Sequence, residues 1–255
     1  DCLILPAEKR LEQIGVEKKC LKRFLEVENV PTFHVNLDHV EGLNRDKIHL
    51  SYVGVFQKNI RGLENLINMV LKDDRFVLNI AGVGDDLDNM IQEASKKSER
   101  VHYHGKVQYT EALKIMNDSD FIVALYYPYM SNHVYAAPNK SYEALFLATP
   151  IITSKGTLVG DKVLKSNTGY VVDDTLEGLR SMFDDVYTEG IAKITSKDIR
   201  YAREMGCDIK LLGVARNTED GIEAYVCPML IPSSHPLASV NDSYNAVFVH
   251  GDAVE

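Results

Sequence analysis

The region from about residue 49 to about residue 182 alternates short apolar runs with amphipathic segments, and this pattern restricts the fold more than any other feature. Apolar runs that predict strands lie at 49–56, 76–81, 101–104, 121–125, 151–153 and 170–172. Segments that predict helices lie at 62–72, 85–97, 109–117 and 140–147. Strands that are apolar throughout are typical of a parallel sheet covered on both faces. We therefore expect an α/β domain with a doubly wound parallel sheet at 49–182.

The regions on either side follow different patterns. In residues 1–48, CLILP predicts a short strand and 8–28 a charged helical stretch, which we interpret as the tail of a preceding domain. In residues 183–255 we expect a smaller α+β segment. Its elements are a capped helix at 195–206 and antiparallel strands at 208–216, 222–227 and 244–249, the first two joined by the turn NTEDG.

Composition excludes several classes of protein. The 255 residues are 45% hydrophobic and 25% charged, which is ordinary for a globular chain. A net charge of −9 repels phosphate backbones, so we expect no nucleic-acid partner, although a local pocket for one nucleotide stays open. Four scattered cysteines and the lack of a long apolar run predict a cytoplasmic chain without a transmembrane segment. Peripheral attachment to the inner face of the membrane is a second possibility for its location.

The loop GVFQKNIRG at 54–62 follows the first predicted strand. Ligands of open α/β sheets bind beyond the carboxyl ends of the strands, which is where this loop lies. Gly54 permits a close backbone approach, and Lys58 and Arg61 would place cations beside a diphosphate. The alternative is a surface turn with solvated charges.

The segment APNKSYEALFLATP at 137–150 carries a second group of polar residues. Asn139 and Lys140 stand at a predicted helix start, where backbone N–H groups and a lysine could hold phosphate. Glu143 follows about one turn later, where a carboxylate could accept vicinal hydroxyls of a ribose or hexose. The alternative makes Asn139 a helix cap and Glu143 an exposed helix residue.

Other motifs argue for little chemistry. The run Gly82-Val83-Gly84 has Leu87 where a dinucleotide fingerprint needs its third glycine. Asp86 and Asp88 form a D-x-D pair that could hold a metal, but acids at a helix start are also explained by the helix dipole. The loop at 153–157 suits either a phosphate contact or a turn. The histidines lack the spacing of metal ligands, and we expect no metal site.

Taken in order, the motifs resemble the C-terminal half of family 4 glycosyltransferases with the GT-B fold. The residues that carry this resemblance are YVGVF, RGLENL, LNIAGVGDD, VHYHGKV, NDSDFIVALY, PNKSYEALFLATPIITS and TGYVV. The resemblance implies a nucleotide-diphosphate sugar as donor and retaining transfer of a hexosyl group to a cell-surface polysaccharide, without a separate cofactor. It places Lys58 and Arg61 at the diphosphate, Glu143 at the ribose, and Gly54, Asn139 and Lys140 in the donor cleft.

The same resemblance defines what differs in this chain. Tyr135 stands eight residues before Glu143, where the family has a first glutamate, and Val55 replaces an arginine. Residues 1–48 resemble the end of the acceptor-side domain, whose remainder a separate chain could supply. We expect the donor-binding domain at 49–182 to be the half of the enzyme that this sequence contains. The resemblance identifies no catalytic residue.

The C-terminal segment resembles a different family. Residues from about 184 to 255, including IRYAREMGCDIKLLGVAR and DGIEAYVCPMLIPSSHPLASVNDSYNAVFVHGDA, are similar to part of the catalytic domain of homoserine dehydrogenase. That resemblance implies an NAD(P)-dependent reduction of aspartate semialdehyde in threonine and methionine biosynthesis. It stands as the alternative function. A third alternative is an inactive fusion of two truncated genes.

Overall fold

The computed structural model describes residues 2–27, 47–84, 87–147, 149–166, 168–189, 207–218, 221–232 and 246–250. The chain divides into two compact units, one at residues 34–199 and the other formed by residues 1–33 and 200–255. The first unit contains the predicted α/β domain and is described first.

A six-stranded sheet forms the centre of the α/β domain, and every strand pair in it is parallel. Its strands are β3 (Ile48–Val55), β4 (Phe76–Val83), β5 (Val101–Gly105), β6 (Phe121–Ala124), β7 (Ile151–Ser154) and β8 (Gly169–Val172). Across the sheet they follow the order β5-β4-β3-β6-β7-β8. The chain therefore builds outward from β3 in one direction and then returns to build outward from β6 in the other.

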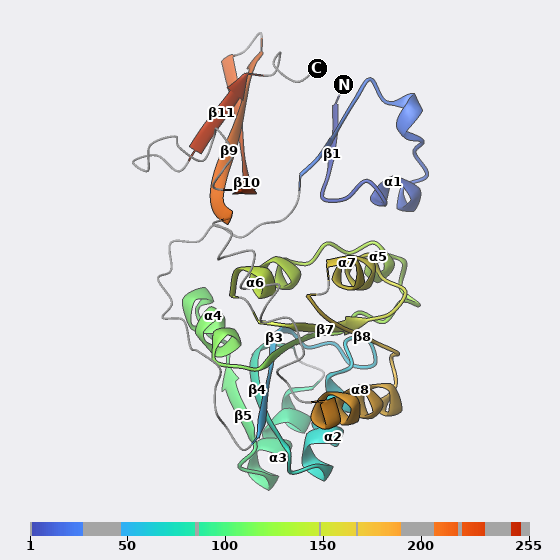
Figure 1. Cartoon of the computed structure of the whole chain (residues 1–255), viewed down its shortest axis with the longest axis vertical. Coiled ribbons are helices and arrows are strands. Elements are labelled where there is room, and N and C mark those ends of the chain that lie inside the picture. Colours follow the sequence, from blue (N-terminus) through green and yellow to red (C-terminus); the bar gives the residue numbers. More distant parts are fainter. Residues whose placement is uncertain are drawn as a thin grey trace. The chain divides into compact units, whose positions relative to one another are not determined.

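Helices cover both faces of this sheet (Figure 1). On one face lie α2 (Leu63–Lys72), α3 (Asp88–Lys97) and α8 (Leu176–Glu189). On the other lie α4 (Tyr109–Asn117), α6 (Asn139–Leu147) and α7 (Leu158–Ser166), and a short helix, α5 (Ser131–Val134), precedes α6. The predicted doubly wound α/β fold is thus confirmed. Helices α5, α7 and α8 were not predicted from the sequence. Helix α5 has only four residues, α7 follows a loop that was left open between a phosphate contact and a turn, and α8 crosses the position where a second segment was expected to begin.

Helix α8 is part of the apolar core of this domain. The Phe183 side chain on α8 is fully buried, and its ring centroid lies 4.7 Å from that of Phe76 and 6.1 Å from that of Phe121. Phe76 begins β4 and Phe121 begins β6, so one aromatic ring of α8 packs against the amino-terminal ends of two strands. The helix runs without interruption across residue 183, where the sequence analysis placed a domain boundary.

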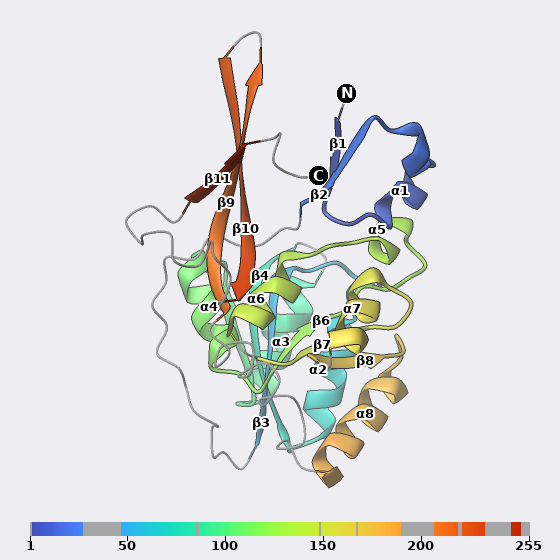
Figure 2. The same ribbon diagram turned by 45° about the horizontal axis from the view of Figure 1, so that its top comes forward.

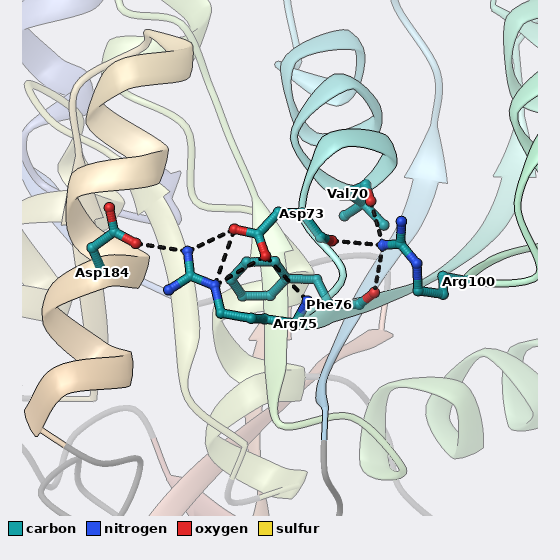
Figure 3. Close-up of polar contacts among 6 residues, drawn as sticks. All are labelled: Val70, Asp73, Arg75, Phe76, Arg100 and Asp184. Carbon is teal, nitrogen blue, oxygen red and sulfur yellow. Dashed lines mark hydrogen bonds and ion pairs between the residues drawn. The ribbon is translucent and has the colours of Figure 1, made fainter.

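Charged contacts hold the same helix from outside the core (Figure 3). The Nη2 of Arg75 donates to Asp73 Oδ2 at 2.6 Å and to Asp184 Oδ1 on α8 at 2.6 Å. The Arg75 guanidinium lowers the pKa of the Asp73 carboxyl through these hydrogen bonds. Nη1 of Arg100 donates to the backbone carbonyls of Val70, Asp73 and Phe76. These contacts tie the α2–β4 turn to both α8 and the start of β5.

The N-terminal strand predicted at CLILP is confirmed, but the residues after it differ from the sequence prediction. Strand β1 (Cys2–Leu5) pairs in parallel with β2 (Arg23–Glu26), and only α1 (Arg10–Gln13) and the 3₁₀ turn η1 (Lys18–Cys20) lie between them. The helical stretch predicted at 8–28 is therefore wrong. Gly15, one residue beyond the C-cap Ile14 of α1, has φ +67°, a conformation that ends a helix. The pairing of β2 with β1 then extends the residues that follow.

The C-terminal residues form a separate three-stranded sheet in the order β10-β9-β11. Strands β9 (Cys207–Thr218) and β10 (Gly221–Pro232) are antiparallel, as predicted, whereas β11 (Ala246–His250) pairs with β9 in parallel. Figure 2 shows the length of the β9–β10 pair. The helix predicted at 195–206 lies outside the described residues. Among the described parts of the chain, no helix has the length and apolarity needed to cross a membrane.

Truncation of Phe183 tests how far the α/β domain depends on α8. Because Phe183 is fully buried against two other phenylalanines, we expect Phe183→Ala to lower the free energy of unfolding by about 3–5 kcal/mol. Leu164→Ala, at an exposed position on α7, is the control and should cost less than about 1 kcal/mol. Urea unfolding of the full chain measures both. Equal losses in the two variants would contradict the placement of α8 in the core.

Candidate functional site

The order of strands creates a point of divergence at the carboxyl ends of the strands in the main sheet. Strands β3 and β6 are neighbours, and the connections that follow them lead to opposite faces of the sheet (Figure 1). In open α/β sheets, this point of divergence at the carboxyl ends of the strands is where ligands bind. The loop at 56–62 after β3 and the loop at 125–138 after β6 flank it. Of the six residues predicted to bind a donor, Lys58 and Arg61 lie in the first loop and Gly54 lies near the end of β3 just before it. Asn139, Lys140 and Glu143 lie on the first two turns of α6, which follows the second loop.

Two glycines bring backbone and side chains unusually close at this edge. Gly54 at the end of β3 has φ +144° and Gly82 at the end of β4 has φ +145°. A Cβ at Gly82 would lie 1.7 Å from the carbonyl oxygen of Gly54. A Cβ at Gly54 would lie 2.8 Å from Nζ of Lys140 on α6. The Lys140 ammonium therefore lies directly over the Gly54 backbone. A side chain at Gly54 would displace the ammonium, and a side chain at Gly82 would displace the Gly54 backbone.

Lys140 and Glu143 occupy successive turns of α6 at its amino-terminal end. Burial lowers the pKa of Lys140, the nearby Glu143 carboxylate raises it, and the charge of Arg61 lowers it further. Glu143 is only 5% exposed, and its Oε1 accepts a hydrogen bond of 3.1 Å from the Tyr109 hydroxyl. The alternative in which Glu143 is an exposed helix residue is therefore wrong.

Arg61 reaches the same edge from the loop after β3. Its Cζ lies 4.8 Å from the centre of the Tyr126 ring, and its Nε donates to Gln57 Oε1 at 3.0 Å. Burial raises the pKa of Tyr126 to about 12, while the charge and hydrogen bond of Arg61 act in the opposite direction. Tyr126 thus fixes the guanidinium within electrostatic range of Lys140. We call Gly54, Arg61, Tyr126, Lys140 and Glu143 the edge cluster.

The other two predicted residues are less closely involved. Asn139 is the first residue of α6 and is exposed, which places it beside the edge cluster at the helix start. Lys58 is exposed, and the structure gives it no hydrogen bond or ion pair with any described residue. The structure therefore brings Gly54, Arg61, Lys140 and Glu143 together and leaves Lys58 apart from them.

Three residues at the site were not predicted from the sequence. Tyr109 contacts Glu143, Tyr126 packs on Arg61, and the buried His133 packs on Tyr126 with ring centroids 5.7 Å apart. His133 Nδ1 lies 3.1 Å from the backbone oxygen of Tyr127. Tyr126 follows directly after an apolar strand, and that position is the sequence signal that could have indicated it. Tyr109 carries no such signal, since its contact is with a distant helix.

The remaining motifs are explained by internal contacts. In the loop at 153–157, Thr153 Oγ1 donates to the Ala124 oxygen and Thr157 Oγ1 to the Ser154 oxygen, so these hydroxyls serve the fold. Asp88 of the D-x-D pair accepts a hydrogen bond of 3.1 Å from Tyr103, and Asp86 lies outside the described residues. Within the part of the chain that the structure describes, no cluster of three His, Cys, Asp or Glu could hold a metal.

Two family models match this chain. The model described as glycosyl transferases group 1 matches residues 47–187, which is more than half of the chain. The model described as homoserine dehydrogenase matches residues 170–255, so the two matches overlap at 170–187. Both resemblances seen in the sequence are confirmed.

Curated relatives that are homoserine dehydrogenases match part of this chain. A homoserine dehydrogenase of Pseudomonas aeruginosa is 56% identical over 77 residues, which are 30% of this chain and 18% of that protein. The homoserine dehydrogenase of Neisseria gonorrhoeae is 42% identical over 107 residues, or 42% of this chain and 23% of that protein. The chain therefore spans about a fifth of the length of these relatives.

Solved structures match the fold. WaaG, a glycosyltransferase involved in lipopolysaccharide biosynthesis, has a TM-score of 0.61 at 14% identity, covering 79% of this chain and 58% of that one. Sucrose-phosphate synthase of Thermosynechococcus elongatus has a TM-score of 0.58 at 21% identity, with coverages of 78% and 52%. The galactosyltransferase WaaB of the lipopolysaccharide outer core has a TM-score of 0.56 at 14% identity, with coverages of 78% and 57%. The GT-B fold expected for the domain is confirmed.

Substitution of Gly82 tests the close approach of β3 and β4. We expect Gly82→Ala to lower the free energy of unfolding by about 2–4 kcal/mol, because the new Cβ overlaps the Gly54 carbonyl. Gly105→Ala is a matched control, since Gly105 also has positive φ but no atom within 4 Å of an added Cβ. It should cost about 1–2 kcal/mol. Urea unfolding at neutral pH compares the two variants, and equal costs would argue against the close approach.

The buried His133 predicts a pH dependence of stability. Burial and the charge of Arg61 lower the pKa of His133 below its usual 6.5, so the unfolded chain binds the proton more readily. The contribution of His133 to stability is complete above pH 6.5 and is lost as pH falls through the folded pKa. We expect His133→Gln to reduce the decline in unfolding free energy between about pH 7 and about pH 5. The exposed His102→Gln should keep it, and an unchanged slope in His133→Gln would contradict this assignment.

Proposed function

The chain belongs to the glycosyl transferases group 1 family, and we propose on this premise that its α/β domain binds a nucleoside-diphosphate sugar for retaining hexosyl transfer. One observation carries the proposal. The Lys140 ammonium lies over the Gly54 backbone at the carboxyl edge of the sheet, and the buried Glu143 carboxylate follows one turn later on the same helix. A cation and a carboxylate at this spacing match a ligand with a phosphate at one end and a diol at the other.

The diphosphate is the end of the donor that the cations favour. Lys140 and Arg61 lie within electrostatic range of each other and repel, and the single carboxylate of Glu143 offsets only one of these two positive charges. The amino-terminal turn of α6 adds backbone N–H groups and the positive end of the helix dipole. Because the chain as a whole has a net charge of −9, this local concentration of positive charge favours one phosphorylated ligand over a polyanion. Lys58, in the exposed part of the same loop, is proposed to approach the diphosphate only when donor is bound.

Glu143 is proposed to bind the ribose of the donor. An ionised carboxylate accepts hydrogen bonds at both oxygens, so it can receive two neighbouring hydroxyls of a sugar. Its low exposure strengthens such hydrogen bonds, since water competes for them less. Gly54 and Asn139 complete the site by leaving room for the ligand at the sheet edge and at the helix start.

The transfer itself needs little covalent chemistry from these residues. The bond between the anomeric carbon and the diphosphate oxygen breaks, and that oxygen keeps the electron pair. A bond to an acceptor hydroxyl oxygen forms on the same face of the sugar, and the acceptor proton leaves. Lys140 and Arg61 would stabilise the charge that develops on the leaving diphosphate.

The proposal extends to the acceptor and to the domain that would bind it. WaaG, which shares the fold, is involved in lipopolysaccharide biosynthesis, and this supports a cell-surface polysaccharide as product. A second domain, supplied by a separate chain or by a longer form of this one, would position the acceptor and exclude water. We place this reaction in the cytoplasm, at or near the inner face of the membrane.

Homoserine dehydrogenase activity is the second candidate. The identity of 56% over 77 residues with the Pseudomonas aeruginosa enzyme favours it, but that match covers 18% of the relative. The dehydrogenase reaction requires NAD(P), and the glycine run at 82–84 lacks the third glycine of a dinucleotide fingerprint. We therefore rank it below the transferase, with an inactive fusion as the third outcome.

Calorimetric titration of the full chain with UDP, GDP, ADP and NADPH tests these alternatives. We expect binding of one nucleoside diphosphate and none of NADPH. Glu143→Ala should weaken that binding by about 1.5–3 kcal/mol, or roughly 10- to 100-fold, because a hydrogen bond to a charged group is lost. Lys140→Met should weaken it to a similar extent.

Glu93→Ala and Lys97→Met provide matched controls. These residues form an exposed ion pair on α3, with 3.6 Å between Lys97 Nζ and Glu93 Oε2, and neither variant should alter nucleotide affinity. Binding of NADPH alone would instead favour the dehydrogenase. If none of the four ligands bound, the inactive fusion would be the better explanation.

A further inference from the structure

The contact between Tyr109 and Glu143 joins two helices that begin far apart in the chain. Tyr109 is the first residue of α4, which follows β5 at the edge of the sheet, whereas Glu143 lies on α6, which follows the central strand β6. The two helices lie side by side on one face of the sheet (Figure 1). The Tyr109 hydroxyl donates to Glu143 Oε1 at 3.1 Å. Tyr109, which is not part of the edge cluster, therefore forms a hydrogen bond with the Glu143 carboxylate, which is.

The surroundings of the two side chains make this contact directional. Burial and the Glu143 charge raise the pKa of Tyr109, so the hydroxyl stays protonated at neutral pH and acts as a donor. The torsion that rotates a carboxylate about its last bond is broad and does not by itself select one orientation. A hydrogen bond to Oε1 selects one, and it leaves Oε2 and a further lone pair of Oε1 for a ligand.

Exposure distinguishes the two partners. Glu143 is 5% exposed, whereas Tyr109 is 45% exposed. The buried Glu143 carboxylate thus has a hydrogen-bond partner that is itself partly in contact with solvent.

We propose that Tyr109 is a positioning residue that orients the Glu143 carboxylate toward the vicinal hydroxyls of the donor ribose and so determines preference for ribonucleotides. This inference rests on the proposed function and specifies its ligand further. The alternative is that Tyr109 only provides a hydrogen-bond donor for a buried carboxylate, without orienting it for a ligand. If Tyr109 only provides a donor, loss of its hydroxyl should change the affinity for all ligands alike. If it positions the carboxylate, the loss should change the affinity only for ligands that carry the two hydroxyls.

The experiment compares a ribonucleoside diphosphate with its 2′,3′-dideoxy counterpart on the full chain. The probe is whichever of UDP, GDP or ADP the wild-type chain binds. We expect wild type to prefer the ribonucleotide by roughly 10-fold or more. In Tyr109→Phe, the ribonucleotide should bind about 3- to 10-fold more weakly, while the affinity for the dideoxynucleotide stays unchanged. Glu143→Ala should abolish the preference, and Tyr109→Phe added to it should have no further effect.

Tyr103→Phe is the matched control. Tyr103 donates to Asp88 Oδ1 at 3.1 Å, so this variant removes a tyrosine–carboxylate hydrogen bond of the same length outside the edge cluster. It should leave both affinities unchanged. Equal weakening of both nucleotides in Tyr109→Phe, or no weakening, would overturn the positioning role even though the proposed function stands. Failure of wild type to bind any nucleoside diphosphate would overturn both.

Discussion

The contact between the ends of β3 and β4 is the constraint on which the candidate site depends. No Cβ fits at Gly82, because the carbonyl oxygen of Gly54 occupies that position. The same arrangement leaves the backbone at Gly54 bare, and Lys140 extends over it from α6. A lysine that is half-buried against backbone keeps its stem packed and its ammonium at the sheet edge. The packing of two strands thus determines where the positive charge of the site lies.

The residues that match both family models are part of the parallel-sheet domain. Residues 170–187 match both family models, and they include β8 and most of α8. In the structure these residues complete the parallel-sheet domain, since Phe183 packs on Phe76 and Arg75 binds Asp184. The aromatic contact buries apolar area, whereas the ion pair is exposed on its Asp184 side and contributes less. The physical continuity of α8 therefore assigns the shared residues to the glycosyltransferase domain, whichever family their sequence resembles.

Much of the fold could be predicted from the sequence, and the errors have physical causes. The six strands of the main sheet were predicted because each is an apolar run, a signal that requires only local residues. The helix predicted at 8–28 failed because pairing between β1 and β2 depends on residues about twenty positions apart. The site residues divide in the same way, into those with a local sequence signal and those that depend on contacts between distant segments. Lys140 and Glu143 could be proposed from their spacing, but Tyr109 could not, since its hydrogen bond to Glu143 depends on how α4 packs beside α6.

In the proposed reaction, the charges of the edge cluster would act differently on donor binding and on transfer. Without a ligand, Glu143 partly balances Lys140 and Arg61, so the site holds one positive charge in excess. A diphosphate reverses that balance, and after the glycosyl bond breaks it carries a further negative charge that the same cations can stabilise. In the proposed reaction, the interactions that favour donor binding would therefore increase as transfer proceeds, which is the condition for catalysis by differential binding. Positioning of the acceptor and exclusion of water involve other groups, so donor affinity and transfer rate should respond to different residues.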